Sequence, residues 1–183
     1  MTSLEKSLPQ YKHLLAFDLT SYGSALAVIN KYVDDENVKV FEVSPCGQSA
    51  ILILLAKEPM ALQVVKTESL AMLKSQILES CVIENVHTDL LPTYLSQNKT
   101  SLQKVMAVLE GGLVSSGLFL ANELLIEGLS LVDFRVIRTH PKNVVITVTA
   151  NSAMAMAHFQ NLDFKYTYIE DIQPALKAFY EIS

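Results

Sequence analysis

The side chains that most often carry chemistry are thinly spread along this chain of 183 residues. The histidines show no H-E-x-x-H spacing and the two cysteines no C-x-x-C spacing, so neither set forms a zinc motif. Three acids are candidates for acid–base chemistry, but no partner can be identified for them and surface solvation explains them better: Asp18, Glu42 and Asp89. We therefore expect no catalytic residue, no metal site and no cofactor, and we do not expect an enzyme.

Glycine motifs that cradle phosphates or expose a nucleophile are also missing, since the chain has no G-x-G-x-x-G, no G-x-x-x-x-G-K-[ST] and no G-x-S-x-G. The pair Gly111-Gly112 follows an apolar run and precedes a helical pattern, where backbone amides could hold a phosphate. A tight turn that requires positive φ is the favoured interpretation, because two glycines carry little specificity.

The charge balance of 14 basic against 19 acidic residues argues against binding to nucleic acid or to an anionic membrane. Hydrophobic residues make up 50% of the chain and charged residues 18%, which favours a folded protein with subunit contacts. The longest apolar run, 50–56, is too short to span a membrane, and the first ten residues contain no apolar signal core. We expect a soluble cytoplasmic protein without disulfides.

An internal repeat decides the predicted organisation. Each half reads strand, helix, strand, strand, helix, strand and short terminal helix, and the matching segments are 14–19 with 105–110, 38–43 with 131–136, 50–56 with 143–150, and 81–86 with 166–172. The second and last pairs share Phe-x-Val and Ile-Glu. The offset between the halves is 91 residues at the start and 86 near the end, with two residues inserted before 131–136.

The repeat predicts an α+β protein made of two tandem ferredoxin-like β-α-β-β-α-β domains. The expected bounds are 11–91 for the first domain, 92–101 for a linker and 102–183 for the second domain. Pro59 suits the first turn of the second helix in the first copy.

The repeated unit resembles the bacterial microcompartment shell domain, element by element, over roughly residues 11–182. The family's Ile-Pro-Arg-Pro-His-x-Asp-Leu tail stands here as Ile83-Glu84-Asn85-Val86-His87-Thr88-Asp89-Leu90. The resemblance implies a structural protein of tandem type, which forms a homotrimer that looks like a hexamer. Other shell proteins are further possible partners, and the location implied is the cytoplasmic microcompartment.

In this family the loop between the second and third strands lines a central pore for small metabolites. By position, the pore loops are Ser44, Pro45, Cys46, Gly47, Gln48 and Ser49 in the first copy and Arg138, Thr139, His140, Pro141, Lys142 and Asn143 in the second. Three copies each of the basic residues in the second loop would give a positive ring that favours small anionic metabolites.

Two departures from the family concern assembly and metal binding. The family tiles shell facets through a lysine and an arginine, and both are missing from both copies. The lysine position falls near Asp34 and near Leu125, and the arginine position falls at Asn85 and at Asp171. Facet tiling should therefore be weak. Some tandem members hold an iron–sulfur cluster through pore-loop cysteines, and Cys46 is the residue that could do so here; an ordinary loop thiol is favoured, since a lone cysteine carries no spacing signal.

Two other classes of protein remain open. One is a regulatory protein that binds small molecules through two ACT-like domains, which dimeric stoichiometry and ligand-specific binding would reveal. The other is an enzyme on a duplicated ferredoxin-like scaffold, which would require convergent ionisable residues. A shared fold alone does not fix a function.

Overall fold

The computed structural model describes residues 10–98, 100–139, 144–152 and 164–182. By spatial proximity the chain divides into two units. Unit 1 consists of residues 1–86 together with the segments 114–119 and 138–141, and unit 2 consists of the remainder. The predicted domains follow the order of the sequence and not proximity, so their bounds, 11–91 and 102–183, stay a prediction.

Unit 1 is built on an antiparallel sheet with the strand order β2-β3-β1-β4. The strands are β1 (His13–Leu19), β2 (Val38–Cys46), β3 (Ser49–Ala56) and β4 (Ile77–Ile83). The central strands β1 and β3 are buried over almost their whole length, which explains why they read as nearly continuous apolar runs.

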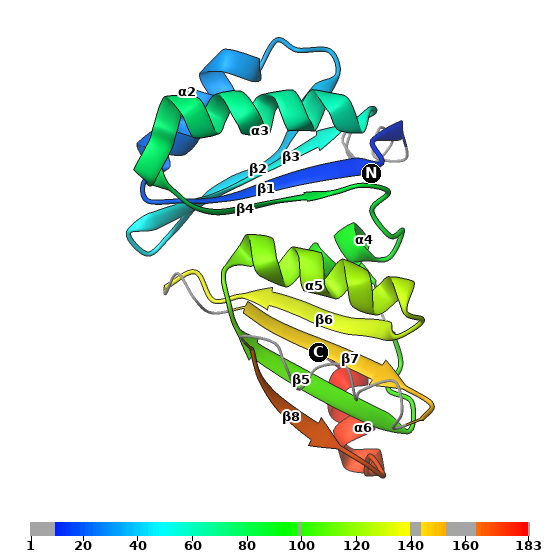
Figure 1. Ribbon diagram of the computed structural model, residues 1–183. Helices are drawn as coiled ribbons and strands as arrows, with labels where there is room; N and C mark the ends of the chain where they lie inside the picture. The colour runs from blue at the N-terminus through cyan, green and yellow to red at the C-terminus, as the bar shows by residue number, and fades with distance from the viewer. Residues whose placement is uncertain (1–9, 99, 140–143, 153–163, 183) are drawn as a thin grey trace. The chain divides into compact units, whose positions relative to one another are not determined.

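Two helices, α2 (Tyr22–Tyr32) and α3 (Pro59–Leu73), lie over one face of this sheet (Figure 1). They bury a core whose members are Leu15, Phe17, Leu19, Ala25, Val28, Leu52, Leu54, Leu62 and Val65, among others. The hydroxyl of Ser21 accepts a hydrogen bond from the Ser24 amide and caps α2, while Pro59 opens α3 as predicted. A short 3-10 turn (Lys74–Gln76) leads from α3 into β4.

Unit 2 contains a second antiparallel sheet, with the order β6-β7-β5-β8. Its strands are β5 (Val105–Gly111), β6 (Ser130–Val136), β7 (Val144–Ala150) and β8 (Phe164–Ile169). The helices are α4 (Leu90–Tyr94), α5 (Val114–Ile126) and α6 (Pro174–Ile182), and the first half of α5 belongs to unit 1. Met106 packs with Ile172, Leu176 and Tyr180 in one core of this unit. The helix expected from residue 152 falls mostly outside the described residues.

The two sheets have the same strand order, which confirms the predicted α+β architecture of two repeated ferredoxin-like units. Each sheet also has a register shift at the same place, between Val40 and Glu42 in β2 and between Leu131 and Asp133 in β6. An inserted residue of this kind forms a β-bulge. The shared irregularity supports descent from one duplicated unit.

The pairing registers correct the predicted alignment of the copies. Ile83 pairs with Leu14, and Ile169 pairs with Met106. The predicted match of Ile83 with Ile169 is therefore correct. The predicted match of Leu14 with Val105 is wrong, because Leu14 corresponds to Met106. The extra residues at the two bulges are Phe41 and Val132, so these two positions are equivalent. The predicted match of the two Phe-x-Val segments was therefore shifted by two residues. The two-residue insertion predicted before 131–136 is wrong.

Candidate functional site

The first predicted pore loop is shorter than the sequence suggested. Ser44, Pro45 and Cys46 continue β2, and Ser49 already belongs to β3, with Cys46 and Ser49 still paired. Only Gly47 and Gln48 form the turn. Gly47 has φ 61°, a conformation that glycine adopts without strain. The expected six-residue loop is therefore the tip of a hairpin, because ladder hydrogen bonds reach further than the apolar pattern indicated.

Arg138 and Thr139, from the second predicted loop, belong to unit 1 and lie against this hairpin. The Gly47 amide donates a 2.7 Å hydrogen bond to the Arg138 carbonyl. The Arg138 guanidinium donates to the Glu42 carboxylate at 2.8 Å and also contacts the Ser44 hydroxyl. Glu42 thus has a charged partner, although the sequence identified none. The ion pair neutralises Arg138, one of the three basic residues expected to form the positive ring. His140, Pro141, Lys142 and Asn143 lie outside the described residues.

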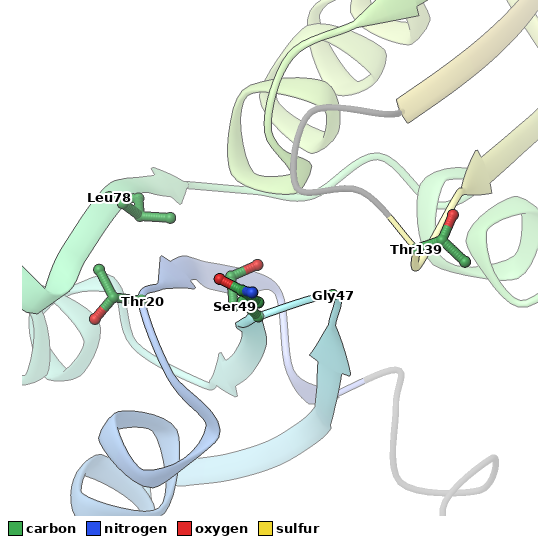
Figure 2. Close-up of a pocket in the computed structure, with 6 residues that line it drawn as sticks. Thr20, Gly47, Ser49, Leu78 and Thr139 are labelled. Carbon is green, nitrogen blue, oxygen red and sulfur yellow. The ribbon is translucent and has the colours of Figure 1, made fainter.

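A pocket of about 440 Å³ opens beside the hairpin tip (Figure 2). Its lining residues come from the ends of β1, β3 and β4 and from both predicted loops: Thr20, Gly47, Gln48, Ser49, Leu78 and Thr139. None of them is charged; three carry a hydroxyl group and one a side-chain amide, on a lining whose surface is mostly apolar. Such a lining can hydrogen-bond a small polar molecule, and it gives no preference of its own for anions.

Asp18 lies near this site and is buried, with only 4% of its surface exposed. Its carboxylate accepts hydrogen bonds from the first two amides of α5, Val114 at 3.1 Å and Ser115 at 2.8 Å. Burial raises the pKa of Asp18 above 3.8, and this effect outweighs the backbone hydrogen bonds that lower it. The predicted surface role of Asp18 is wrong, because the carboxylate caps a buried helix end. Asp89, by contrast, is exposed as expected.

Both cysteines are held in environments that disfavour the thiolate. Cys46 is 2% exposed, and burial is the main cause that raises its pKa. The Cys81 thiol donates to the Ser115 carbonyl at 3.1 Å, and burial raises its pKa to about 12. A buried thiol with a raised pKa fits the ordinary loop cysteine favoured for Cys46 from the sequence, and the cluster considered there stays untested. Within the described ranges, no three acidic, histidine or cysteine side chains gather to hold a metal.

These environments predict slow thiol chemistry. At pH 8, both cysteines should react with a disulfide reagent at least about tenfold more slowly in native protein than in 8 M urea, because Cys46 is buried, Cys81 is partly buried, and burial raises the pKa of each thiol. A timed thiol titration of wild type and of the Cys46→Ser and Cys81→Ser variants assigns the two rates. Rapid native labelling of Cys46 would contradict the burial described here and restore the cysteine as a ligand candidate.

Among the residues that the structure describes, none of the helices combines the length and the apolar character needed to cross a bilayer.

The fold is similar to that of a solved microcompartment protein from Desulfitobacterium hafniense DCB. The TM-score is 0.75 and the identity 17%, over 92% of this chain and 99% of that chain. At this identity the likeness is one of fold, and it confirms the fold that the sequence resemblance predicted. A mutant chlorite dismutase from Candidatus Nitrospira defluvii has a TM-score of 0.32 at 6% identity, over 94% and 95% of the two chains, which is too low to carry an argument. No protein-family model and no curated protein matches the sequence.

Proposed function

We propose that this chain is a structural shell or shell-associated protein of a bacterial microcompartment. The supporting observation is the fold shared with the microcompartment protein over nearly the full length of both chains. The absence of a metal-ligand cluster among the described residues agrees with a structural role but does not carry it.

The proposed assembly is a homotrimer in which the two copies of each chain make up a six-unit ring. Half of the residues are hydrophobic, and several large apolar side chains stay exposed on the single chain, including Met60, Val64, Phe119 and Ile126. Large exposed apolar side chains are candidates for an interface between proteins wherever they gather into a patch. Shell proteins of the same family remain possible further partners.

The proposed pore is lined by the hairpin tip at Gly47-Gln48 and by the segment 138–143. The Arg138–Glu42 pair supports a structural role for this arginine, because the pair is neutral as a unit. A preference for small anionic metabolites therefore rests on His140 and Lys142. The uncharged pocket beside the tip, mostly apolar with a few hydroxyl and amide groups, fits a small neutral solute that has both apolar surface and hydrogen-bonding groups.

Weak facet tiling remains part of the proposal. Asp34, Asn85 and Asp171 are exposed but carry no positive charge, and Leu125 is 5% exposed and cannot present one. Asn85 and Asp171 hold equivalent places in the two copies, with φ 57° and 49°. A minor shell component or an adaptor at an edge fits these side chains better than a facet protein does.

Native mass spectrometry and sedimentation velocity test the assembly. Three chains of 20.3 kDa should give a trimer of about 60 kDa at micromolar concentration. A tagged chain, expressed in a host with microcompartments, should co-purify with the shells, while a tagged unrelated protein of similar size should not. A protein that stays monomeric would contradict the trimer. A dimer whose melting temperature rises with one small metabolite would support the ACT-like alternative instead.

A further inference from the structure

Glu110 occupies the same place in the second sheet that Asp18 occupies in the first. Asp18 on β1 pairs with Ile51 on β3 and Glu79 on β4. Glu110 on β5 pairs with Val145 on β7 and Lys165 on β8. The alignment of the two copies matches Ile51 with Val145 and Glu79 with Lys165. The two acids therefore occupy equivalent positions on the central strands β1 and β5. One acid is buried and the other is exposed.

The two first helices differ in the same way. Val114 and Leu118 on α5 are 2% and 0% exposed, and Val114 carries one of the two amides that donate to Asp18. Their equivalents on α2 are Tyr22 and Leu26, which are 42% and 45% exposed. The opposite face of α2 packs in the core of unit 1. The start of α2 therefore carries two apolar side chains that the described part of the chain leaves exposed.

The polar groups on both sides of this missing contact are open. The amides of Tyr22 and Gly23 find no hydrogen-bond partner among the described residues, although the next amide, of Ser24, is capped by Ser21. The Glu110 side chain is exposed and so is free to accept hydrogen bonds from a partner. The first amides of a helix need acceptors and favour negative charge.

We propose that the start of α2 docks on the Glu110 end of the second sheet in another copy of this chain, repeating the contact between Asp18 and α5. Glu110 accepts from the Tyr22 and Gly23 amides, and the Tyr22–Leu26 stripe becomes buried. This inference rests on the proposed trimer and adds the residues that close it.

A second polar contact follows from the same equivalence. The Cys81 thiol donates to the Ser115 carbonyl in unit 1. The position equivalent to Cys81 is Thr167, which is exposed on β8, and the position equivalent to Ser115 is Gly23. In the docked copy the Thr167 hydroxyl donates to the Gly23 carbonyl, so each junction has two polar contacts and one apolar stripe.

The occupant is a second copy because each chain has both surfaces of the contact, the start of α2 and the Glu110 end of the second sheet, and both are exposed among the described residues. Such a head-to-tail contact continues until the ring closes. A trimer closes with three identical junctions.

Charge reversal at Glu110 tests the polar contact. Glu110→Lys places an ammonium group at the positive end of α2 and should raise the trimer dissociation constant at least about tenfold per junction, with Glu110→Gln in between. Leu26→Asp should weaken the trimer from the other side. Glu127→Lys is the matched control, because it makes the same charge change at an exposed site in the turn after α5 and should leave the trimer unchanged.

Disulfide trapping tests the geometry. A side chain added at Gly23 meets only the Ser21 hydroxyl at 3.8 Å, so Gly23→Cys fits without distortion. Mild oxidation of mixed Gly23→Cys and Glu110→Cys chains should give a covalent dimer, and the double variant a covalent trimer. Either single variant alone should give no such product.

The outcomes separate the inference from the proposed function. A wild-type protein that is not a trimer overturns both. A wild-type trimer that forms no Gly23–Glu110 cross-link, with Glu110→Lys as stable as Glu127→Lys, overturns the docking contact and leaves the trimer standing.

Discussion

Replacement of Asp18 by alanine is expected to lower the free energy of unfolding by about 2–5 kcal/mol, because two buried amides lose their acceptor. The amides belong to Val114 and Ser115. A buried N–H group without an acceptor has lost its hydrogen bonds to water and gained none in return. This desolvation free energy is larger than the net contribution of an ordinary hydrogen bond to stability. Urea unfolding followed by circular dichroism measures the change. A loss below about 0.5 kcal/mol, the range typical of surface substitutions, would contradict the capping role.

The pH dependence of stability isolates the charge of Asp18. The pKa of this group is raised above 3.8 in the folded protein, so the folded state binds the proton more tightly than the unfolded state. The contribution of Asp18 to stability is therefore greatest below 3.8 and falls as pH rises through the raised pKa. Asp18→Asn removes this fall, and the difference between wild type and variant should change across that window. Parallel pH curves would show that Asp18 does not titrate there.

Replacement of Gly112 by alanine is expected to destabilise unit 2 by about 2–4 kcal/mol, from backbone strain and overpacking together. Gly112 has φ 66°, and a Cβ at this position would overlap the ring of Phe164 at the start of β8. The turn cannot open easily, because Gly111 beside it pairs with both Val144 and Phe164. Thermal and urea unfolding measure the loss.

Two other glycines serve as controls for Gly112. Gly128 has φ 88° with open space around it, so Gly128→Ala should cost about 1 kcal/mol from strain alone. Gly23 has ordinary space and stands at a helix start, so Gly23→Ala should be close to neutral. Equal effects at Gly112 and Gly128 would show that the Phe164 ring moves aside at no cost.

The order of elements could be predicted from the sequence because apolar runs, turns and helical spacing repeat in both halves. The positive φ expected for Gly111 and Gly112 is confirmed, at 130° and 66°. The register of β6 could not be predicted from its Phe-x-Val. A β-bulge adds one residue without any fixed residue type, so two shared residues do not fix which positions are equivalent.

The chemistry of the candidate site escaped prediction because its partners lie far apart in sequence. Asp18 is 96 residues from Val114, and Glu42 is 96 residues from Arg138. One local signal was present, since Asp18 is a single charge inside the apolar run 14–19. A charge in a strand that is buried on both faces requires a partner, even where the sequence does not identify it.

The strand order also bears on how the chain is made. β1 lies between β3 and β4, and β5 lies between β7 and β8, so each central strand keeps one edge vacant until the last strand of its copy has been synthesised. Pairing over so long a separation is slow, and a vacant edge in one copy accepts a strand of the same topology from the other. The few identities between the copies oppose such an exchange, since a misplaced strand would not fit the core that it enters. Divergence after duplication thus acts as kinetic protection against swapped strands during translation.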